Sequence, residues 1–586
     1  MDLASAALPP RLHHAAAEHL QVLYGPARTP ALLDRLEGLL AAQRAAAPSP
    51  APAPPLTQRE ALLITYADQL RSPGQAPLRT LAGWLEQRLA GVVRGVHLLP
   101  FYPWSSDDGF SVIDYEQVDA RYGTWDDVGR IAGRFRLMVD AVLNHVSADS
   151  AWFKGFLAGD RRWRNFFIAV DPQTDLSAVV RPRDLPLLTP FDAAGGARHV
   201  WTTFSADQVD LNYAEPEVLF AVLRAVLGYL RRGAQLLRLD AVAFAWKEIG
   251  TPCIHLPQAH ALVRLLRVAL EAAAPGVQLI TETNVPHEEN ISYFGDGTNE
   301  AHMVYQFALP PLVLHSFLSG DAASLTAWAA ALRLPSDQVS FFNFLASHDG
   351  IGVRPAHGIL EQGEIDRLVS TVEARGGRVS YRRVGRSERQ PYELNITYLD
   401  ALTPAGEAET QPARTAARFL AAHAILLSLA GLPGIYFHSL VGSRNDHAGV
   451  ERSGMARAIN RAKLDRAQLD AGLAQPGSVR RRVFEGMLHL LRARAGHPAF
   501  HPSAPQRVLD LGPQVFALLR GEARAGGRVL CLHPVGGEPL ILRSGLRAPP
   551  GAAAVDLLSG RPCDPDRIEL APYQAAWIAL EGSDGS

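Results

Sequence analysis

Eight short apolar segments, separated by amphipathic stretches, constrain the fold of this 586-residue chain most strongly. Near-continuous apolar strands that alternate with helices indicate a parallel sheet covered by helices. Eight such units predict a closed (β/α)8 barrel, an α/β fold in which functional side chains lie at the carboxyl ends of the strands. The predicted strands are residues 62–66, 95–99, 137–141, 236–242, 278–282, 303–307, 339–344 and 434–437.

The segments outside these units predict further domains. Residues 1–58 read as a helical appendage of two short helices, the second spanning 32–40, and an Ala/Pro linker at 45–55 that cannot form a core. Barrel residues 59–146 and 208–504 are interrupted after the third and seventh strands. These insertions are too long for simple crossovers and predict a lid domain and a second substrate-binding loop region. Short β-rich runs predict a C-terminal antiparallel domain. The lid covers residues 147–207, the second loop region 350–400 and the C-terminal domain 505–586.

Composition narrows the class of protein. A formal net charge of -2 argues against nucleic acid or an anionic membrane as the partner. The widely spaced Cys253, Cys531 and Cys563 form neither a disulfide framework nor a zinc motif, which suits a reducing compartment. No signal-peptide pattern opens the sequence, and the most apolar stretch, 419–437, reads as a helix, a turn and a buried strand. We therefore expect a cytoplasmic protein, with its oligomeric state open.

Charged residues stand where several of the predicted strands end. Arg238 and Asp240 end the fourth strand, Glu282 ends the fifth, and Asp349 follows the seventh. Taken alone, Arg238 and Asp240 fit a structural ion pair as well as an active site. Three carboxylates at one barrel mouth favour glycoside chemistry, in which one carboxylate attacks and another donates a proton. Arg238 faces the same side of the strand as Asp240, so we expect it to keep that carboxylate ionised.

Longer motifs around these residues resemble the alpha-amylase superfamily. They are the segments 97–102 (HLLPFY), 139–145 (VDAVLNH), 238–242 (RLDAV) and 347–349 (SHD), together with Glu282. The chain is similar to the sucrose phosphorylase group in segments 64–68, 107–110, 308–312, 348–353 and 457–461. It resembles the glucosylglycerate phosphorylase branch of that group in segments 100–108, 170–175, 281–287 and 391–395. The resemblance runs from about residue 60 to the end.

This resemblance implies a retaining phosphorylase that uses inorganic phosphate as co-substrate and needs no cofactor. Asp240 is implied to be the nucleophile, Glu282 the general acid/base, and Asp349 the carboxylate that stabilises the oxocarbenium-like transition state. The glucose subsite is implied to contain Asp107, Phe110, His145, Phe204, His348 and Arg457, and we count Arg238 among the substrate-binding residues. His145 and His348 could otherwise be buried structural histidines, which the motif set makes the weaker interpretation.

The acceptor side is less determined. Arg181 and Arg183 fall in the first insertion, where the phosphorylases place cationic groups, although an isolated pair is usually a solvated surface. A planar guanidinium suits phosphate and carboxylate equally, so both interpretations stay open. Glu393 stands where the sucrose enzymes have glutamine, and Phe244 where they have tyrosine. Both departures favour a smaller aglycone, such as glycerate or glycerol, over the fructose of sucrose.

Asn144 raises the question of a metal. It matches a position that binds calcium in many amylases. Hard cations need six or more oxygen ligands, and no oxygen-rich cluster accompanies Asn144 in the sequence. We therefore expect no metal site.

The predicted reaction is cleavage of 2-O-alpha-glucosylglycerate by phosphate, through a glucosyl-enzyme, to alpha-glucose 1-phosphate and glycerate. Phosphorylases for sucrose, sucrose 6'-phosphate or glucosylglycerol are alternatives that use the same chemistry. An alpha-glucosidase or transglucosidase is a further alternative, which would keep its rate without phosphate. A non-catalytic sugar-binding relative is the last, and the complete carboxylate set argues against it.

Overall fold

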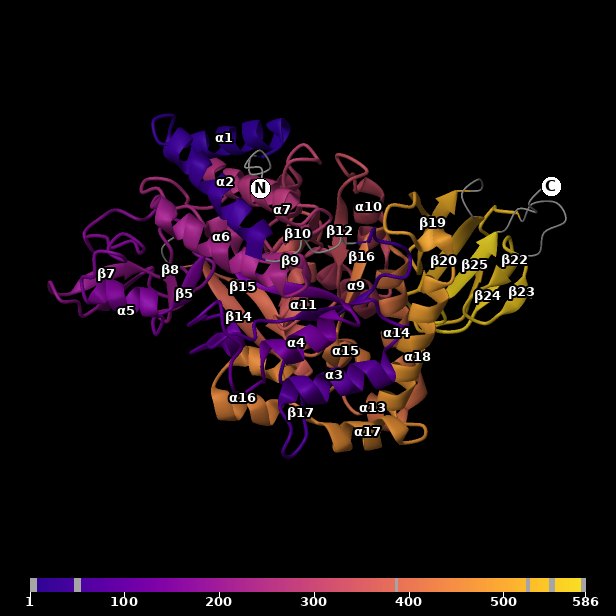
Figure 1. Cartoon of the computed structure of the whole chain (residues 1–586). Helices are drawn as coiled ribbons and strands as arrows, with labels where there is room; N and C mark the ends of the chain where they lie inside the picture. Colours follow the sequence, from indigo (N-terminus) through magenta and orange to yellow (C-terminus); the bar gives the residue numbers. More distant parts are fainter. Residues whose placement is uncertain (1–7, 47–53, 385–387, 523–526, 548–553, 581–586) are drawn as a thin grey trace.

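The computed structural model describes residues 8–46, 54–384, 388–522, 527–547 and 554–580. Its centre is a closed barrel of eight parallel strands, with the spatial order β1-β16-β12-β11-β10-β9-β4-β3 (Figure 1). All eight strands overlap the predicted segments, so the predicted (β/α)8 barrel is confirmed. Their bounds are β1 Leu62–Thr65, β3 Gly95–Leu98, β4 Arg136–Val142, β9 Ala234–Asp240, β10 Gln278–Thr281, β11 Met303–Tyr305, β12 Ser340–Asn343 and β16 Leu432–Tyr436.

Helices connect these strands on the outside of the barrel. Apolar residues at helical spacing bury one face of each helix against the sheet. α6 is buried on nearly all sides, including Phe220 and Tyr229, because N-terminal helices cover its outer face. The helices that connect barrel strands are α3 Pro77–Arg88, α4 Trp125–Ala132, α6 Pro216–Arg231, α7 Pro257–Ala273, α8 His287–Ile291, α9 Leu309–Ser319, α10 Ala323–Ala331 and α14 Pro412–Ser428. After the last strand, β16, come α15 Phe437–Leu440, α16 His447–Ser453, α17 Arg466–Ala474 and α18 Val479–Ala495.

Strand register brings the charged residues together at one end of the barrel. Arg238 on β9 pairs with Asp140 on β4 and with Ile280 on β10. Two residues further along β9, Asp240 closes its strand. Glu282 follows the last residue of β10 and donates its backbone N–H to the Leu239 carbonyl. The carboxyl ends of β9 and β10 therefore present Asp240 and Glu282 side by side.

The insertion after β4 forms a small body of its own. It contains β5 His145–Ser147, α5 Ala151–Leu157, β6 Leu188–Phe191, β7 Arg198–Trp201 and β8 Gln208–Asp210. β5 pairs with β8 and β6 with β7 in antiparallel ribbons. A separate apolar cluster includes Trp201 from this body and Cys253 from the loop after β9. That cluster anchors the insertion to the barrel.

The insertion after β12 forms a three-stranded sheet of order β13-β15-β14. Its elements are β13 Ile351–Gly352, α11 Gln362–Ala374, β14 Arg378–Val384, β15 Glu388–Asn395 and α12 Tyr398–Leu402. Glu393 on β15 lies opposite Gly352 on β13. Because β13 begins two residues after Asp349, this pairing brings the inserted sheet to the mouth of the barrel.

The N-terminal appendage is a helical hairpin of α1 Pro10–Tyr24 and α2 Thr29–Ala46. α2 is longer than the predicted 32–40 and continues through Ala45, where the sequence predicted the linker to start. The hairpin packs over α6 and α7 in Figure 1 and buries leucines such as Leu12, Leu20 and Leu36. Most of the predicted linker, residues 47–53, lies outside the described residues.

The C-terminal part is antiparallel, as predicted. Its main sheet has the order β18-β19-β20-β25-β22-β23, and β21 and β24 form a separate pair. The strands are β18 Gln506–Leu509, β19 Val515–Glu522, β20 Gly527–Pro534, β21 Leu540–Leu542, β22 Ala554–Asp556, β23 Arg561–Cys563, β24 Ile568–Leu570 and β25 Ala576–Leu580. It lies beside the barrel, at the right of Figure 1.

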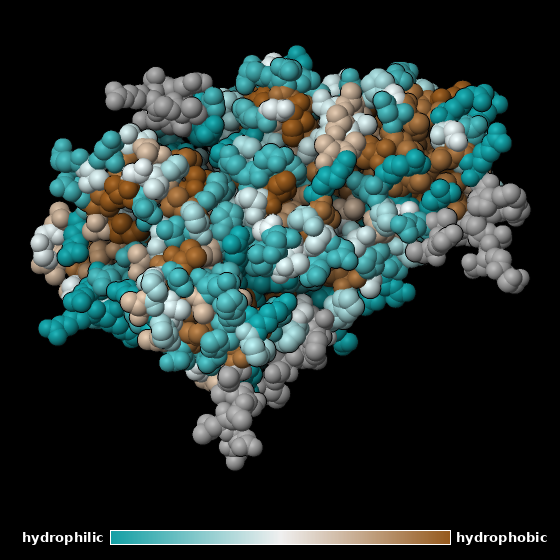
Figure 2. All heavy atoms as spheres, turned by 90° about the horizontal axis from the view of Figure 1, so that it is seen from above, coloured by the Kyte–Doolittle hydropathy of each residue, from teal (hydrophilic) through white to brown (hydrophobic). Residues whose placement is uncertain are grey.

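The apolar stretch 419–437 forms the end of α14, a turn and β16, which confirms the predicted helix, turn and buried strand. Among the described residues, no helix combines the length and the hydropathy that crossing a membrane requires. The face shown in Figure 2 has hydrophobic side chains in several separate patches among hydrophilic ones.

Candidate active site

A pocket at the carboxyl ends of the barrel strands collects most of the predicted site residues. Loops after β3, β9, β10 and β12 supply its floor, and the two insertions supply its walls. The predicted residues that line it are Asp107, Phe110, His145, Arg183, Phe204, Asp240, Glu282, His348, Asp349, Glu393 and Arg457. Arg238 lies directly beneath them, and Arg181 does not line the pocket.

Arg238 is the charge centre of the pocket floor. Its buried guanidinium donates to Asp240 Oδ1 at 2.7 Å and to Asp140, which is fully buried. Its other nitrogen lies 3.8 Å from Glu282 Oε2. Asp140 also contacts His97 Nε2 at 2.7 Å. One cation therefore neutralises parts of three carboxylates, with Asp240 bound more closely than Glu282.

Arg238 is not the only group that acts on the protonation of Asp240. Burial, together with the nearby Glu282 and Asp140 carboxylates, raises the pKa of Asp240 to about 8. Burial also raises the pKa of Glu282, with Asp349 adding to the effect. Arg238 opposes both shifts without cancelling them, because it is shared among several carboxylates. The two carboxyls are therefore coupled, and a proton on one of them favours ionisation of the other.

Geometry decides which member of the pair is the anion. Asp240 accepts a charge-assisted hydrogen bond from Arg238, whereas Glu282 accepts a neutral one from the Ala241 backbone N–H at 3.1 Å. The stronger bond favours the charge on Asp240 and the proton on Glu282. Ala241 holds a left-handed backbone with φ of 51°, a strained conformation for alanine that aims its N–H at Glu282.

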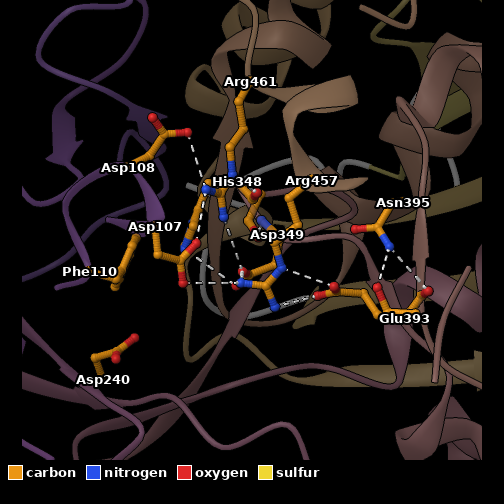
Figure 3. Close-up of polar contacts among 12 residues, drawn as sticks. Asp107, Asp108, Phe110, Asp240, His348, Asp349, Glu393, Asn395, Arg457 and Arg461 are labelled. Carbon is orange, nitrogen blue, oxygen red and sulfur yellow. Dashed lines mark hydrogen bonds and ion pairs between the residues drawn. The ribbon is translucent and has the colours of Figure 1, made fainter. Parts of the chain in front are cut away.

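A line of alternating charges forms the opposite wall (Figure 3). Arg457 lies 2.7 Å from Asp349 Oδ1 and forms a bidentate pair with Glu393 at 2.8 and 3.0 Å. Burial alone would raise the pKa of Asp349, but Arg457, His348 and Arg461 lower it well below its usual value. Asp349 is therefore a fixed negative charge that does not compete for the catalytic proton.

Asp107 lies at the tip of a strained loop after β3. Both Asp107 and Asp108 have positive φ, of 52° and 50°. A Cβ on the next residue, Gly109, would lie 2.5 Å from the Pro100 carbonyl oxygen, so only glycine fits there. Arg461 pairs with both aspartates at 3.2 Å. Burial alone would raise the pKa of Asp107. Arg461, together with Arg183 and Arg457, instead lowers that pKa to about 2.

Aromatic and imidazole rings line the side of the pocket. Phe110 stacks on His348 with ring centroids 4.5 Å apart, and its carbonyl oxygen lies 2.9 Å from His145 Nε2. Phe204 lies 5.4 Å from the His145 ring. Burial lowers the pKa of His145 to about 4 and that of His348 to about 3. Both histidines are therefore neutral and can exchange hydrogen bonds with sugar hydroxyls.

The two arginines of the first insertion separate in the structure. Arg183 lines the pocket, with Nη2 3.6 Å from Asp107 and its guanidinium 5.7 Å from the Phe204 ring. Arg181 instead donates to the Leu185 carbonyl. Phe244 packs edge-on against Phe204 at 5.5 Å and does not line the pocket itself.

A family model for the alpha-amylase catalytic domain matches residues 90–351. The glucosylglycerate phosphorylase of Allomeiothermus silvanus is 52% identical over 578 residues, which cover 98% of this chain and 100% of that protein. The chain belongs to the alpha-amylase family, in its sucrose phosphorylase-like group. The glucosylglycerate phosphorylase of Escherichia coli is 46% identical, over 89% of this chain and 92% of that protein.

A solved member of the alpha-amylase family has the same architecture. The crystal structure of sucrose 6F-phosphate phosphorylase from Thermoanaerobacter thermosaccharolyticum superposes with a TM-score of 0.70 at 26% identity. The match covers 82% of this chain and 94% of that one. Most of this chain therefore has the same fold as that enzyme.

For this alpha-amylase family member, sequence reasoning missed several pocket residues. Gln208, Asn284 and Tyr392 line the pocket, and Arg461 supports its rim. Tyr392 and Arg461 stand inside motifs that carried the resemblance, so the motif membership was the available signal. Asn284 likewise lies within segment 281–287, which carried the resemblance, whereas Gln208 lies at a predicted domain boundary and carried no signal of its own.

Asn144, the position associated with calcium in many amylases, is engaged by a lysine. Lys247 Nζ lies 2.7 Å from Asn144 Oδ1. Within the residues that the structure describes, no group of three or more His, Cys, Asp or Glu side chains is arranged to hold a metal.

Proposed function

We propose that this chain is a retaining phosphorylase that converts 2-O-alpha-glucosylglycerate and inorganic phosphate into alpha-glucose 1-phosphate and glycerate. The substrate assignment rests on the 52% identity to a glucosylglycerate phosphorylase, over 98% of this chain and 100% of that protein. The pocket supports the reaction class, because one buried guanidinium contacts both Asp240 and Glu282. Two carboxylates held this close fit double displacement with retention.

In the first step, the Asp240 carboxylate attacks the anomeric carbon while Glu282 donates its proton to the departing glycerate oxygen. Asp349, ionised by Arg457, stabilises the positive charge that develops on the sugar ring. Asp107 and Arg457 bind the glucose hydroxyl farthest from the bond that breaks. His145 and His348 bind further hydroxyls, and Phe110 and Phe204 pack beside the glucosyl group.

In the second step, hydrogen phosphate attacks the glucosyl–Asp240 ester. The Asp240 carboxylate leaves, and the proton of the attacking phosphate passes to Glu282. The products are alpha-glucose 1-phosphate and an enzyme with Asp240 ionised and Glu282 protonated. Glu282 gives up one proton in the first step and regains one in the second, so the cycle needs no further acid or base.

Glycerate and phosphate are both anions and occupy the same side of the pocket in turn. Arg183 lines that side and has its nearest carboxylate, Asp107, at 3.6 Å, so its guanidinium retains capacity for a ligand. We assign it to anion binding. Arg181 bonds to a backbone carbonyl and has no role in this assignment. Glu393 is bound to Arg457, which narrows the acceptor side and favours a small aglycone.

The first test measures alpha-glucose 1-phosphate release with phosphate from glucosylglycerate, glucosylglycerol, sucrose and sucrose 6'-phosphate. We expect release from glucosylglycerate only. Release of alpha-glucose 1-phosphate from another glucoside of the panel would change the assigned aglycone but leave the assigned reaction class unchanged. Free glucose at an unchanged rate without phosphate would make the protein a hydrolase. Binding of glucosides without any turnover would make it a sugar-binding relative.

We further propose that the protein works in a reducing compartment such as the cytoplasm. Cys253, Cys531 and Cys563 are all free thiols in the structure. Such thiols persist where glutathione keeps them reduced. Fractionation of the producing cell tests this, and recovery in the secreted fraction would contradict it.

A further inference from the structure

A buried ammonium lies where the barrel, the first insertion and the loop after β9 meet. The side chain of Lys247 is 2% exposed. Its Nζ lies 2.6 Å from Asp210 Oδ2 on β8 and 2.7 Å from Asn144 Oδ1, just before β5. Charged groups are rarely buried without such partners. The three segments are therefore joined through one cation.

Asp210 extends this junction into the first insertion. Its fully buried carboxylate accepts hydrogen bonds from the Thr203 backbone N–H and Thr203 Oγ1, both at 2.7 Å. It also accepts one from Asn144 Nδ2 at 2.9 Å. Together with Lys247, these donors satisfy the carboxylate from three directions. Asn144 and Asp210 also bond to each other, so Lys247 completes a closed ring of contacts.

The residues bound around Lys247 lie close, in sequence or by strand pairing, to residues that line the pocket. Asn144 precedes His145, and Thr203 precedes Phe204. Asp210 pairs with His145 across the β5–β8 ribbon and lies two residues after Gln208. Gln208 Nε2 in turn lies 3.2 Å from His145 Nε2. One wall of the pocket is thus fixed through the groups that Lys247 binds, although Lys247 itself does not reach the pocket.

We propose that Lys247 is a positioning residue whose buried ammonium holds the His145–Phe204–Gln208 wall of the glucose subsite. Side-chain oxygens of Asn144 and Asp210 point toward the same position, and the Lys247 ammonium occupies that position and bonds to both. The inference rests on the proposed location of the glucose subsite, and its test is therefore built on glucose binding as well as on turnover.

Removing the ammonium leaves Asp210 charged and buried, so the wall relaxes toward another arrangement. Substitution Lys247→Met should weaken glucose binding and lower kcat/KM for glucosylglycerate and for glucose 1-phosphate by a similar factor, about 10–100-fold. The KM values for phosphate and glycerate should stay within about twofold, because Arg183 lies outside the ring of contacts. A general loss of folding would change all of these values together.

Lysine 154 provides a matched control in the same insertion. Its side chain is 61% exposed and pairs with Asp149 at the surface. Lys154→Met is the same substitution as Lys247→Met and removes the same charge. It should leave both glucose affinity and kcat/KM unchanged.

Chemical rescue gives the sharper test. Lys247→Ala lacks a propylammonium equivalent, so added propylammonium should restore glucose binding, measured by calorimetry, in a saturable manner. Tetramethylammonium at the same ionic strength should not, because it has no N–H donors. A folded Lys247→Met variant with wild-type glucose affinity would overturn the proposal. Equal rescue of Lys247→Ala by propylammonium and by tetramethylammonium would overturn it as well.

If the single variants do not fold, Lys247→Met combined with Asp210→Asn removes both buried charges. Weak glucose binding by the folded double variant supports positioning, and wild-type binding overturns it. Failure of the wild-type protein to phosphorolyse any glucoside would reject the proposed function only. Calorimetry with glucose would then still decide the role of Lys247.

Discussion

At the residue scale, the Arg238 guanidinium interacts with the carboxylates of Asp140, Asp240 and Glu282, and this sharing influences their protonation. The pKa of Asp240 is about 8 and that of Glu282 is raised, chiefly through burial. Turnover needs the state with one proton, in which Asp240 is ionised and Glu282 is protonated. Protonation of both groups removes the nucleophile at low pH, and ionisation of both removes the acid at high pH.

We therefore expect a bell-shaped profile of kcat/KM whose alkaline limb reports loss of the proton that the Asp240–Glu282 pair shares, at a pH above the usual carboxyl range. Glu282→Gln should lower kcat by about 10²–10⁴-fold and remove that limb, because an amide neither donates the proton nor titrates. Glu288→Gln, at an exposed position six residues further on, should change neither. A wild-type rate that stays constant to pH 10, or an alkaline limb that survives in Glu282→Gln, would contradict this assignment.

At the scale of elements, the α1–α2 hairpin covers the outer face of two barrel helices. Its leucines face α6 and α7, the helices that flank the strand of the proposed nucleophile. Arg35 pairs bidentately with Glu217 on α6, and Arg11 with Glu271 on α7. The apolar face of the hairpin is therefore already used within this chain.

Truncation of a hairpin leucine should lower stability without changing catalysis. Leu20 is fully buried, so Leu20→Ala should reduce the free energy of unfolding by about 2–5 kcal/mol. Val22 on the same helix is 50% exposed, and Val22→Ala should stay within about 0.5 kcal/mol. Urea denaturation measures both. Equal effects of the two variants, or a fall in kcat for Leu20→Ala with stability unchanged, would show that the hairpin has another role.

At the scale of the whole molecule, Arg494 on α18 joins three parts of the chain. Its buried guanidinium donates to the carbonyls of Glu60 before β1, Leu427 on α14 and Phe500 before the C-terminal sheet, at 2.9, 3.1 and 3.1 Å. The guanidinium has carbonyl oxygens rather than a carboxylate as partners. These bonds fix the start of the barrel, its closing helices and the appended sheet relative to one another.

Arg494→Met should lower the free energy of unfolding by about 3 kcal/mol or more, because several buried carbonyls lose their donor. Arg492→Met, at an exposed position on the same helix, should change it by less than about 0.5 kcal/mol. Chemical denaturation followed by tryptophan fluorescence checks both variants. Similar stability of Arg494→Met and the wild type would mean that water replaces the lost donors.

The sequence by itself determined the barrel, because each strand is a nearly continuous apolar run and such runs can only be buried on both faces. It also placed Asp240, Glu282 and Asp349 at one mouth, since residues that end parallel strands meet at one edge. The positions of the domain boundaries and the roles of the site residues remain predictions from the same patterns.

Only the tertiary structure decided how the charges are shared. Sequence spacing put Arg238 beside Asp240, but strand register also brought Asp140 and Glu282 to the same guanidinium. Burial, together with these two carboxylates, raises the pKa of Asp240. Loop geometry separated Arg183 from Arg181, two residues apart, and placed Lys247 between Asn144 and Asp210. Pair energies of buried charges depend on distances across the fold, and no local pattern in the sequence encodes those distances.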